Sequence, residues 1–363
     1  KDASDTVTNT ENTISEKKNL IDTLTSGLDA VKNRVQAAMD KIAQGSLGFF
    51  QHLIDNNTVK YEDTSTRKDE NGKYGSYVID GWEYDENGDP IKAITHWVPN
   101  ELKDSQADIS EEQKAIDFLK KYSKTEIGSE NDATSLENTK YAIEQLLKMN
   151  EAREGQDDPD TEEIESLKGW RVSSTEMAKA QLYANLSAKE YRHHGSWENL
   201  MGYGSDKFDS QQGYDGWFLS EKAVYEYCKE HQEELGLTEL TSSSVKELQT
   251  RITKEQVADL VSYVNEKYPD LDFRYETTIN TNNNIQIGHY LNVVDSESNV
   301  TGVGVASPAN EYDPTYHGWY VTQEFNKSGY KDYRGDTGSF TVASDKASWD
   351  ATEYYGMFMS YYN

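Results

Sequence analysis

The stretch "NNNIQIGHYLNVVD", residues 282–295, places a Gly-His-Tyr triplet directly before a run of apolar and β-branched residues. The run resumes as "NVTGVGVAS" after the turn sequence "DSES", and two such runs around a turn predict a β-hairpin. His289 would then stand where the first strand of the hairpin begins. A single histidine in a strand is as often a packing residue as a chemical one, so other segments must decide its role.

The overall composition limits the classes of protein that this chain can represent. The 363 residues include 36 Lys and Arg against 65 Asp and Glu, a net charge of −29, which repels nucleic acid and anionic membrane surfaces. Cys228 is the only cysteine, which excludes an intramolecular disulfide and a cysteine-rich zinc site. No stretch reaches the ~18 to 20 apolar residues of a membrane span. These features predict a well-solvated protein that is either intracellular or exported by a bacterium, with no nucleic-acid partner.

A heptad pattern marks the N-terminal part of the chain. Apolar residues recur every seven positions from Ile14 to Ile42, and a second set, which begins at Leu24, lies three residues further on. Only Lys17 interrupts the pattern. The heptad pattern predicts a long helix over about 14–44, which either packs back on the body of the protein or forms the end of a coiled-coil stalk. Phe49 and Phe50 follow the helix as an expected anchor in the core.

Further elements follow from period and capping signals. Residues 74–98 alternate and turn at Asn87-Gly88, which predicts a β-hairpin. Helices are expected over about 110–123 and 134–153, the first of them capped by Ser110. Another helix is expected to end at His193 and His194, before a long glycine- and tyrosine-rich loop. The helix that follows, "WFLSEKAVYEYCKEH", places Trp217, Glu221 and Tyr225 on one face, and a polar helical segment comes after it.

Five motifs in order carry a resemblance to a known family. They are "NEAREG" (150–155), "ANLSAKEYRHH" (184–194), "WENLMGYG" (197–204), "GWFLSEKAVY" (216–225) and "GHYLNVV" (288–294). Their order and spacing resemble the CAP superfamily, the SCP-like extracellular domains named for cysteine-rich secretory proteins, antigen 5 and pathogenesis-related 1 proteins. The likeness is strongest to the cysteine-poor branch found on Gram-positive cell surfaces. Trp197 stands where that family usually has glycine.

The resemblance implies a fold and a division of the chain. The implied fold is α+β, an α-β-α sandwich of three layers with an antiparallel sheet, in which "ENL" begins a loop and "GHY" opens a strand. It would occupy residues 134–326. Residues 1–133 would form an N-terminal helical region with the hairpin at 74–98, and residues 327–363 a C-terminal extension.

The resemblance also implies a site. In the family, two histidines and two glutamates face one another across a cleft and can hold a divalent cation, often zinc. The matching residues here are His193, Glu198, Glu221 and His289, with His194 as the alternative to His193. Imidazole nitrogens and carboxylates are a chemically sensible zinc set.

Three functions are consistent with these features. The leading expectation is a secreted or cell-wall-associated bacterial protein whose CAP-like domain recognises an extracellular glycan, lipid or peptide. The alternative is an extracellular, protease-like hydrolase in which Glu198 or Glu221 acts as general base and His289 orients the substrate. A third is a structural stalk or surface-exclusion protein with a relic cleft, and an oligomer through the N-terminal helix is a further expectation.

Several weaker signals have plainer interpretations. Asp85, Asn87 and Asp89 begin like a calcium loop, but Pro90 stands where such a loop needs glycine. The Arg-Gly-Asp sequence at 334–336 is a frequent tripeptide. Ser196 lies near the histidines without a nucleophile-elbow motif, and Cys228 is expected to be a packed core residue. The other histidines, His52, His96, His231 and His317, match nothing in the family and are expected to be surface or packing residues.

Overall fold

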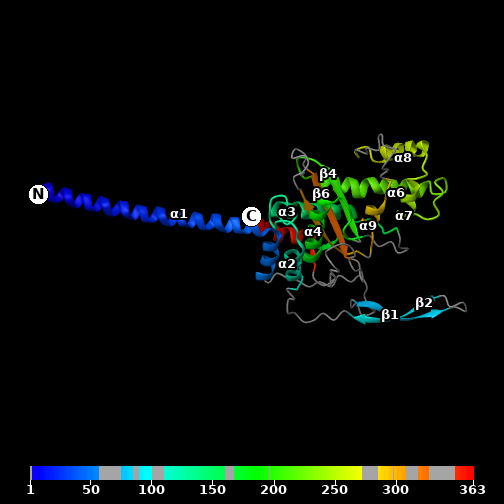
Figure 1. The fold of residues 1–363 in the computed structure, drawn as a ribbon, viewed down its shortest axis with the longest axis horizontal. Coiled ribbons are helices and arrows are strands. Elements are labelled where there is room, and N and C mark those ends of the chain that lie inside the picture. Colours follow the sequence, from blue (N-terminus) through cyan, green and yellow to red (C-terminus); the bar gives the residue numbers. More distant parts are fainter. Residues whose placement is uncertain are drawn as a thin grey trace.

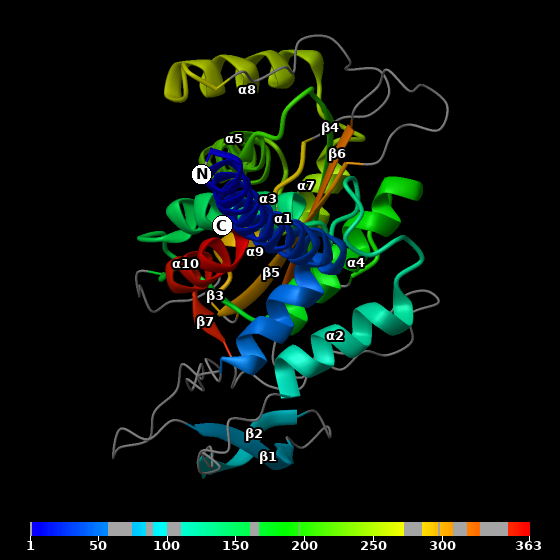
Figure 2. The same cartoon turned by 90° about the vertical axis from the view of Figure 1, so that its left-hand side faces the viewer.

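The computed structural model describes residues 2–56, 75–84, 90–99, 110–159, 167–195, 197–271, 285–296, 298–307, 318–326 and 348–363. The fold is α+β, as predicted: a long N-terminal helix leads into a body in which one mixed five-stranded sheet packs against helices (Figures 1 and 2). Within these residues, we find no helix with the length and apolarity of a membrane span.

Helix α1 (Asp2–Asp55) is longer than the heptad pattern predicted and projects from the body (Figure 1). Its apolar stripe is exposed, so the expectation that it packs back on the body is wrong. The helix kinks at Gly45, whose φ of 54° lies in the left-handed region where glycine is favoured. After the kink, the Ser46 amide donates to the Thr134 carbonyl at 2.7 Å, and Phe49 and Phe50 are fully buried. The predicted aromatic anchor is therefore confirmed.

The sheet has the strand order β4-β6-β5-β3-β7. Its strands are β3 (Arg171–Val172), β4 (Glu198–Gly204), β5 (Val300–Ala306), β6 (Gly318–Asn326) and β7 (Trp349–Asp350). Strands β4, β6 and β5 are antiparallel neighbours, but β3 pairs parallel to β5, so the sheet is mixed and not antiparallel throughout as expected. Only two residues make the parallel pairing, too short a run for a sequence pattern to report its direction.

Helix α4 (Ser174–Lys189) packs closely on the sheet because glycine replaces larger residues beneath it. A Cβ on Gly302 or Gly304 of β5 would strike the α4 backbone. Thr322 of β6 donates its hydroxyl to the Ala180 carbonyl of α4 at 2.8 Å on the same face. Edge strand β4 and its neighbour β6 therefore lie at a fixed position relative to α4.

One continuous core joins segments from the whole length of the chain. Phe49 of α1 makes edge-on ring contacts with Tyr354 and Phe358 of α10 (Ala351–Tyr362) at 5.3 and 5.2 Å. The same hydrophobic cluster includes residues of α2 (Ser110–Tyr122), of α3 (Leu136–Arg153) and of the sheet. The division of the chain into three regions remains a prediction.

The remaining elements of the body are α5 (Ser210–Gly213), the π-helical segment η1 (Tyr214–Ser220), α6 (Glu221–Glu230), α7 (Ser242–Leu248), α8 (Lys254–Lys267) and α9 (Gly288–Val293). Of these, α6, α7, α8 and α9 lie on the side of the body away from α1 (Figure 1). Strands β1 (Gly75–Tyr84) and β2 (Pro90–Pro99) form the predicted hairpin; its turn, with Asp85, Asn87 and Asp89, lies outside the described residues.

Three local predictions are wrong. The "GHY" segment begins helix α9 and not a strand, and the "ENL" segment is strand β4 and not a loop. The helix that was expected to end at the histidines ends at Lys189, where the Glu190 backbone turns to an extended conformation. The helices predicted over 110–123 and 134–153 are confirmed within two residues at each end as α2 and α3.

Candidate functional site

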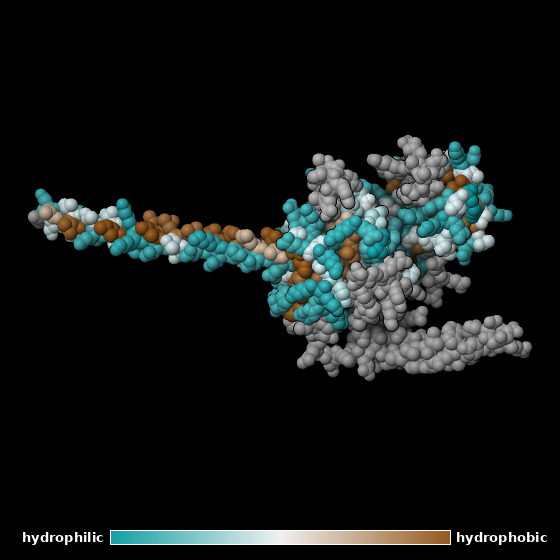
Figure 3. All heavy atoms as spheres, viewed as in Figure 1, coloured by the Kyte–Doolittle hydropathy of each residue, from teal (hydrophilic) through white to brown (hydrophobic). Residues whose placement is uncertain are grey.

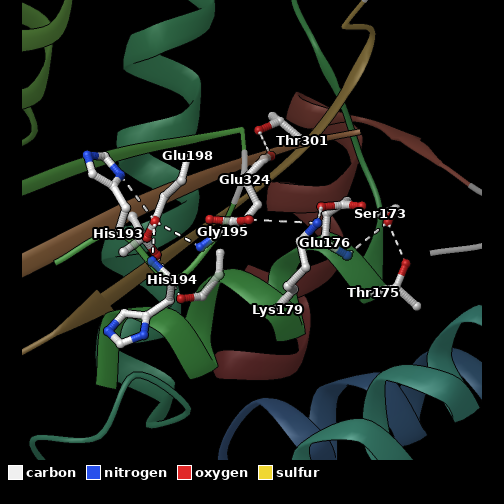
Figure 4. A network of polar contacts seen from close by, with 12 residues as sticks. Ser173, Thr175, Glu176, Lys179, His193, His194, Gly195, Glu198, Thr301 and Glu324 are labelled. Atoms are coloured by element: carbon white, nitrogen blue, oxygen red, sulfur yellow. Dashed lines mark hydrogen bonds and ion pairs between the residues drawn. The ribbon is translucent and has the colours of Figure 1, made fainter. Parts of the chain in front are cut away.

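Glu198, at the start of β4, binds the loop that carries the two adjacent histidines. Its Oε2 accepts hydrogen bonds from the backbone N–H groups of His194 at 2.7 Å and Gly195 at 3.0 Å. The same oxygen lies 3.2 Å from Nδ1 of His193 (Figure 4). The Glu198 side chain is fully buried, whereas 49% of the His193 side chain is exposed. The carboxylate therefore fixes the ring from beneath and leaves its outer edge open to solvent.

Glu221, at the start of α6, makes the same arrangement with the second histidine. Its Oε2 accepts from the backbone N–H groups of His289 at 2.8 Å and Tyr290 at 3.0 Å, and its Oε1 lies 2.6 Å from Nδ1 of His289. The two backbone donors belong to the first turn of α9. A carboxylate from a distant part of the chain thus caps this helix, which is favourable because the free N–H groups there carry partial positive charge.

The two His–Glu pairs meet, and so the structure brings all four predicted site residues together. The ring centroids of His193 and His289 are 6.5 Å apart, and the buried Trp217 ring lies 6.1 Å from His289. His194 points elsewhere: its buried ring stacks on Tyr183 at 6.0 Å, and burial lowers its pKa. Of the two candidate histidines, His193 is therefore the one whose ring faces His289.

The two His–Glu pairs determine which nitrogen of each imidazole ring carries the proton. Each carboxylate faces Nδ1, so the favoured neutral tautomer carries its proton on Nδ1 and a lone pair on Nε2. Among the described residues, nothing forms a hydrogen bond with Nε2 of His193 or His289. An imidazole whose Nδ1–H is held by a carboxylate is the usual arrangement of a metal-binding histidine.

The described residues contain no group of three or more His, Cys, Asp or Glu side chains arranged to hold a metal ion. The donor set that fits a cation here is thus two imidazole nitrogens, with water or a bound ligand supplying the other positions. Glu198 and Glu221 stand behind the rings, as groups that orient them.

Arg153 supports the site but was not predicted from the sequence. Its buried guanidinium donates to the carbonyl of Val293, the last residue of α9, at 2.6 Å, and to those of Asp295 at 2.9 Å and Ser298 at 2.8 Å, which follow the helix. Burial lowers the pKa of this arginine to about 10. Glu221 thus holds the beginning of α9, and Arg153 holds its end. The "NEAREG" motif contained this residue, but no local signal indicated that it would reach a helix 140 residues away.

A buried charged cluster lies beneath the Glu198 pair (Figure 4). Glu324 of β6 is the direct cross-strand partner of Glu198, so both side chains point to the same face of the sheet. Lys179 of α4 lies 3.7 Å from Glu324 and 2.8 Å from Glu176. The Glu324 carboxylate also fills the space under Gly195, where a Cβ would strike it. No sequence pattern indicated this cluster, because its assembly depends on the register of the strands.

Among the described residues, the weaker sequence signals are packing or surface side chains. Cys228 is buried and burial raises its pKa to about 12, as expected for a packed core thiol. His231 faces Glu234 on the surface, and His52 packs on Tyr361. The side chain of His96 lies outside the described residues, as do Ser196, His317 and the Arg-Gly-Asp sequence at 334–336.

No protein-family model, curated protein or solved structure matches this chain, so its likeness to the CAP superfamily rests on the five sequence motifs and remains a prediction.

Proposed function

We propose that this chain is the recognition part of a secreted or cell-wall-associated bacterial protein, and that the His193–Glu198 and His289–Glu221 pairs form its binding site. One observation carries the proposal: two imidazoles, each held at Nδ1 by a buried carboxylate, lie 6.5 Å apart with Nε2 of both rings available. The ligand class is an extracellular glycan, lipid or peptide. A CAP-like sandwich of three layers is part of the same proposal.

A divalent cation, with zinc as the first candidate, suits the two nitrogens. Neutral imidazole is a good zinc ligand, and a carboxylate behind it fixes the tautomer and the orientation of the ring. Such an ion would polarise an oxygen atom of the ligand that completes its coordination. The chain itself would orient the two rings and keep both carboxylates out of water.

The geometry favours binding over hydrolysis. A general base needs a free lone pair beside the attacking water, but each carboxylate has one oxygen that already accepts two backbone N–H groups. The side chain of Glu198 is fully buried and that of Glu221 is 5% exposed. Both groups are therefore better placed to hold the site together than to activate water.

Calorimetric titration with zinc tests the proposal. We expect the intact chain to bind one ion and His289→Ala to bind it at least about tenfold more weakly. His231→Ala is the matched control, because its ring also lies 3.2 Å from a glutamate, but on the surface, and its zinc affinity should equal that of the parent chain. If zinc does not bind to the parent chain, or binds to His289→Ala with equal affinity, the proposal that the two histidines hold a metal ion is refuted.

The recognition part has a separate test. An array of cell-wall glycans, lipids and peptides is exposed to the parent chain and to His193→Ala/His289→Ala. The proposal requires a ligand whose binding is lost in the double variant. Labelling of intact cells with an antibody against the chain tests its placement at the surface, and labelling only after lysis would contradict it.

A further inference from the structure

An apolar stripe runs along the projecting part of α1 (Figure 3). We call it the α1 stripe; it comprises Val7, Ile14, Leu20, Ile21, Leu24, Leu28, Val31, Val35, Met39 and Ile42, which are 45–63% exposed. In the described part of the chain, only one other large hydrophobic side chain, Tyr191, is exposed. Exposed apolar surface concentrated in this way marks an interaction surface, since scattered single residues are the norm.

The spacing of the stripe identifies the shape of its partner. Six of its residues, from Val7 to Ile42, recur at intervals of seven, and Leu24 and Val31 lie three residues after members of that set. In a straight helix, a strict seven-residue repeat drifts by about 20° per heptad, so only a partner that winds around α1 follows the whole stripe. A second helix does this, whereas a flat protein surface does not.

We infer that the partner is a second copy of this chain, paired through α1 in a parallel two-stranded coiled coil. With the recurring set at heptad position a, five of its six members are β-branched, the exception being Leu28. Leu24 and Val31 occupy position d. β-Branched residues at a, combined with leucine at d, are typical of parallel dimers; position d here holds Thr10, Lys17, Leu24, Val31 and Ala38, so the preference for a dimer rests mainly on position a. In register, every a layer would be apolar on both sides.

The charges of α1 also permit self-pairing. Residues 2–44 contain seven Asp and Glu and five Lys and Arg, so this segment carries −2 of the chain's net charge of −29. Electrostatic repulsion between copies is therefore weakest along α1. In the parallel register, position g of each heptad faces position e of the next heptad in the partner. The facing pairs are Thr6–Glu11, Thr13–Lys18, Leu20–Thr25, Gly27–Lys32 and Arg34–Met39. None of these pairs brings like charges together.

The area is sufficient for a stable contact. Each apolar side chain of this size hides roughly 60 to 120 Å² when it is fully buried, and about half of that is still exposed in the stripe. Ten side chains from each of two copies would therefore remove about 1,000 Å² from water, which is near the lower limit for a specific interface.

Lys17 favours the parallel orientation. It occupies a d position, so in a parallel pair the two lysines share one layer, where their like charges repel each other and each ammonium group reaches water along its flexible stem. In an antiparallel pair, each lysine would face an apolar residue, and two layers would be interrupted. A single polar layer of this kind also sets the register, at some expense in affinity.

Sedimentation equilibrium of the whole 363-residue chain tests the pairing. We expect a dimer at about 50 μM, a concentration that a micromolar dissociation constant would saturate. Leu24→Lys/Leu28→Lys should be monomeric. Asn19→Lys/Asn33→Lys adds the same charge on the opposite face of α1 and should remain dimeric. Lys17→Leu should lower the dissociation constant by about tenfold.

Disulfide trapping tests the orientation. Thr10→Cys occupies a d position, so in the parallel pair the two new thiols meet and should cross-link under oxidising conditions. In an antiparallel pair they would lie roughly 40 Å apart and could not. Cys228 is buried and does not compete. A monomeric parent chain, a trimer or tetramer, dimerisation unaffected by Leu24→Lys/Leu28→Lys, or a dimer that Thr10→Cys does not cross-link would overturn the inference.

Discussion

Replacing Glu221 tests whether one carboxylate both folds α9 and orients His289. Glu221 is buried, with 4% of its surface exposed, and it accepts three contacts: the amides of His289 and Tyr290 and the Nδ1 of His289. In Glu221→Ala the two amides lose their acceptor. A buried donor left without a partner costs about 1–3 kcal/mol, and loss of a helix cap costs about 0.5–2 kcal/mol. Because the two effects overlap, we expect the free energy of unfolding to fall by about 2–4 kcal/mol.

Glu221→Gln separates the two roles. The amide oxygen still accepts from the backbone of α9, so the expected loss of stability is about 1 kcal/mol. The amide NH₂ is then the group that faces the ring, which favours a proton on Nε2 of His289 and removes the lone pair that would bind a cation. We therefore expect near-normal stability with zinc affinity reduced at least about tenfold.

Urea unfolding followed by tryptophan fluorescence measures the first effect, and zinc calorimetry measures the second. Glu230→Ala, on the same helix but largely exposed, is the control and should change stability by less than about 0.5 kcal/mol. The reasoning fails if Glu221→Ala is as stable as this control, or if Glu221→Gln binds zinc as tightly as the parent chain.

Three further predictions concern other parts of the molecule. Gly45→Ala should lower stability by about 2 kcal/mol or more in a thermal melt, because φ is 54° and the new methyl group would strike the Thr134 carbonyl; an unchanged melting temperature would contradict the kink. Cys228 should react with a thiol reagent at neutral pH only after unfolding, since burial raises its pKa to about 12; labelling of the folded chain would contradict this. Burial lowers the pKa of His194, so the stability that its neutral ring contributes is present above its ordinary value of 6.5 and is lost as the pH falls through its lower folded value. The melting temperature should therefore decrease between about pH 7 and pH 5, and His194→Phe, which keeps a ring on Tyr183, should decrease less; an equal decrease would remove His194 as a cause.

The elements that the sequence predicted well are those whose signals are local. Helices α2 and α3 carry their own apolar period, and α3 begins at a Ser135 cap whose side chain accepts from the Asn138 amide. The heptads of α1 likewise repeat within a single helix. Such patterns depend on residues a few positions apart, so they can be recognised without the rest of the fold.

The errors arise where a distant residue decides the local structure. The "GHY" segment has no cap of its own, and it becomes a helix because Glu221, 68 residues earlier, accepts from its first amides. The "ENL" segment becomes a strand because β6 pairs with it. The four candidate site residues were found through the family resemblance. Arg153 and Glu324 were missed, because they approach the site only when α9 and the sheet register are in place.

The junction at Gly45 has a mechanical consequence. Residues 2–45 of α1 extend about 65 Å from the body, so this segment acts as a lever. At its base, the Ser46 amide binds Thr134, the Lys41 ammonium binds the carbonyl of Tyr361 at 2.9 Å, and Phe49 is locked in the core. These contacts keep α1 from rotating relative to the body. A sideways force at the tip of α1 therefore turns the whole body and does not bend the junction. The direction of the lever would then determine which way His193 and His289 face.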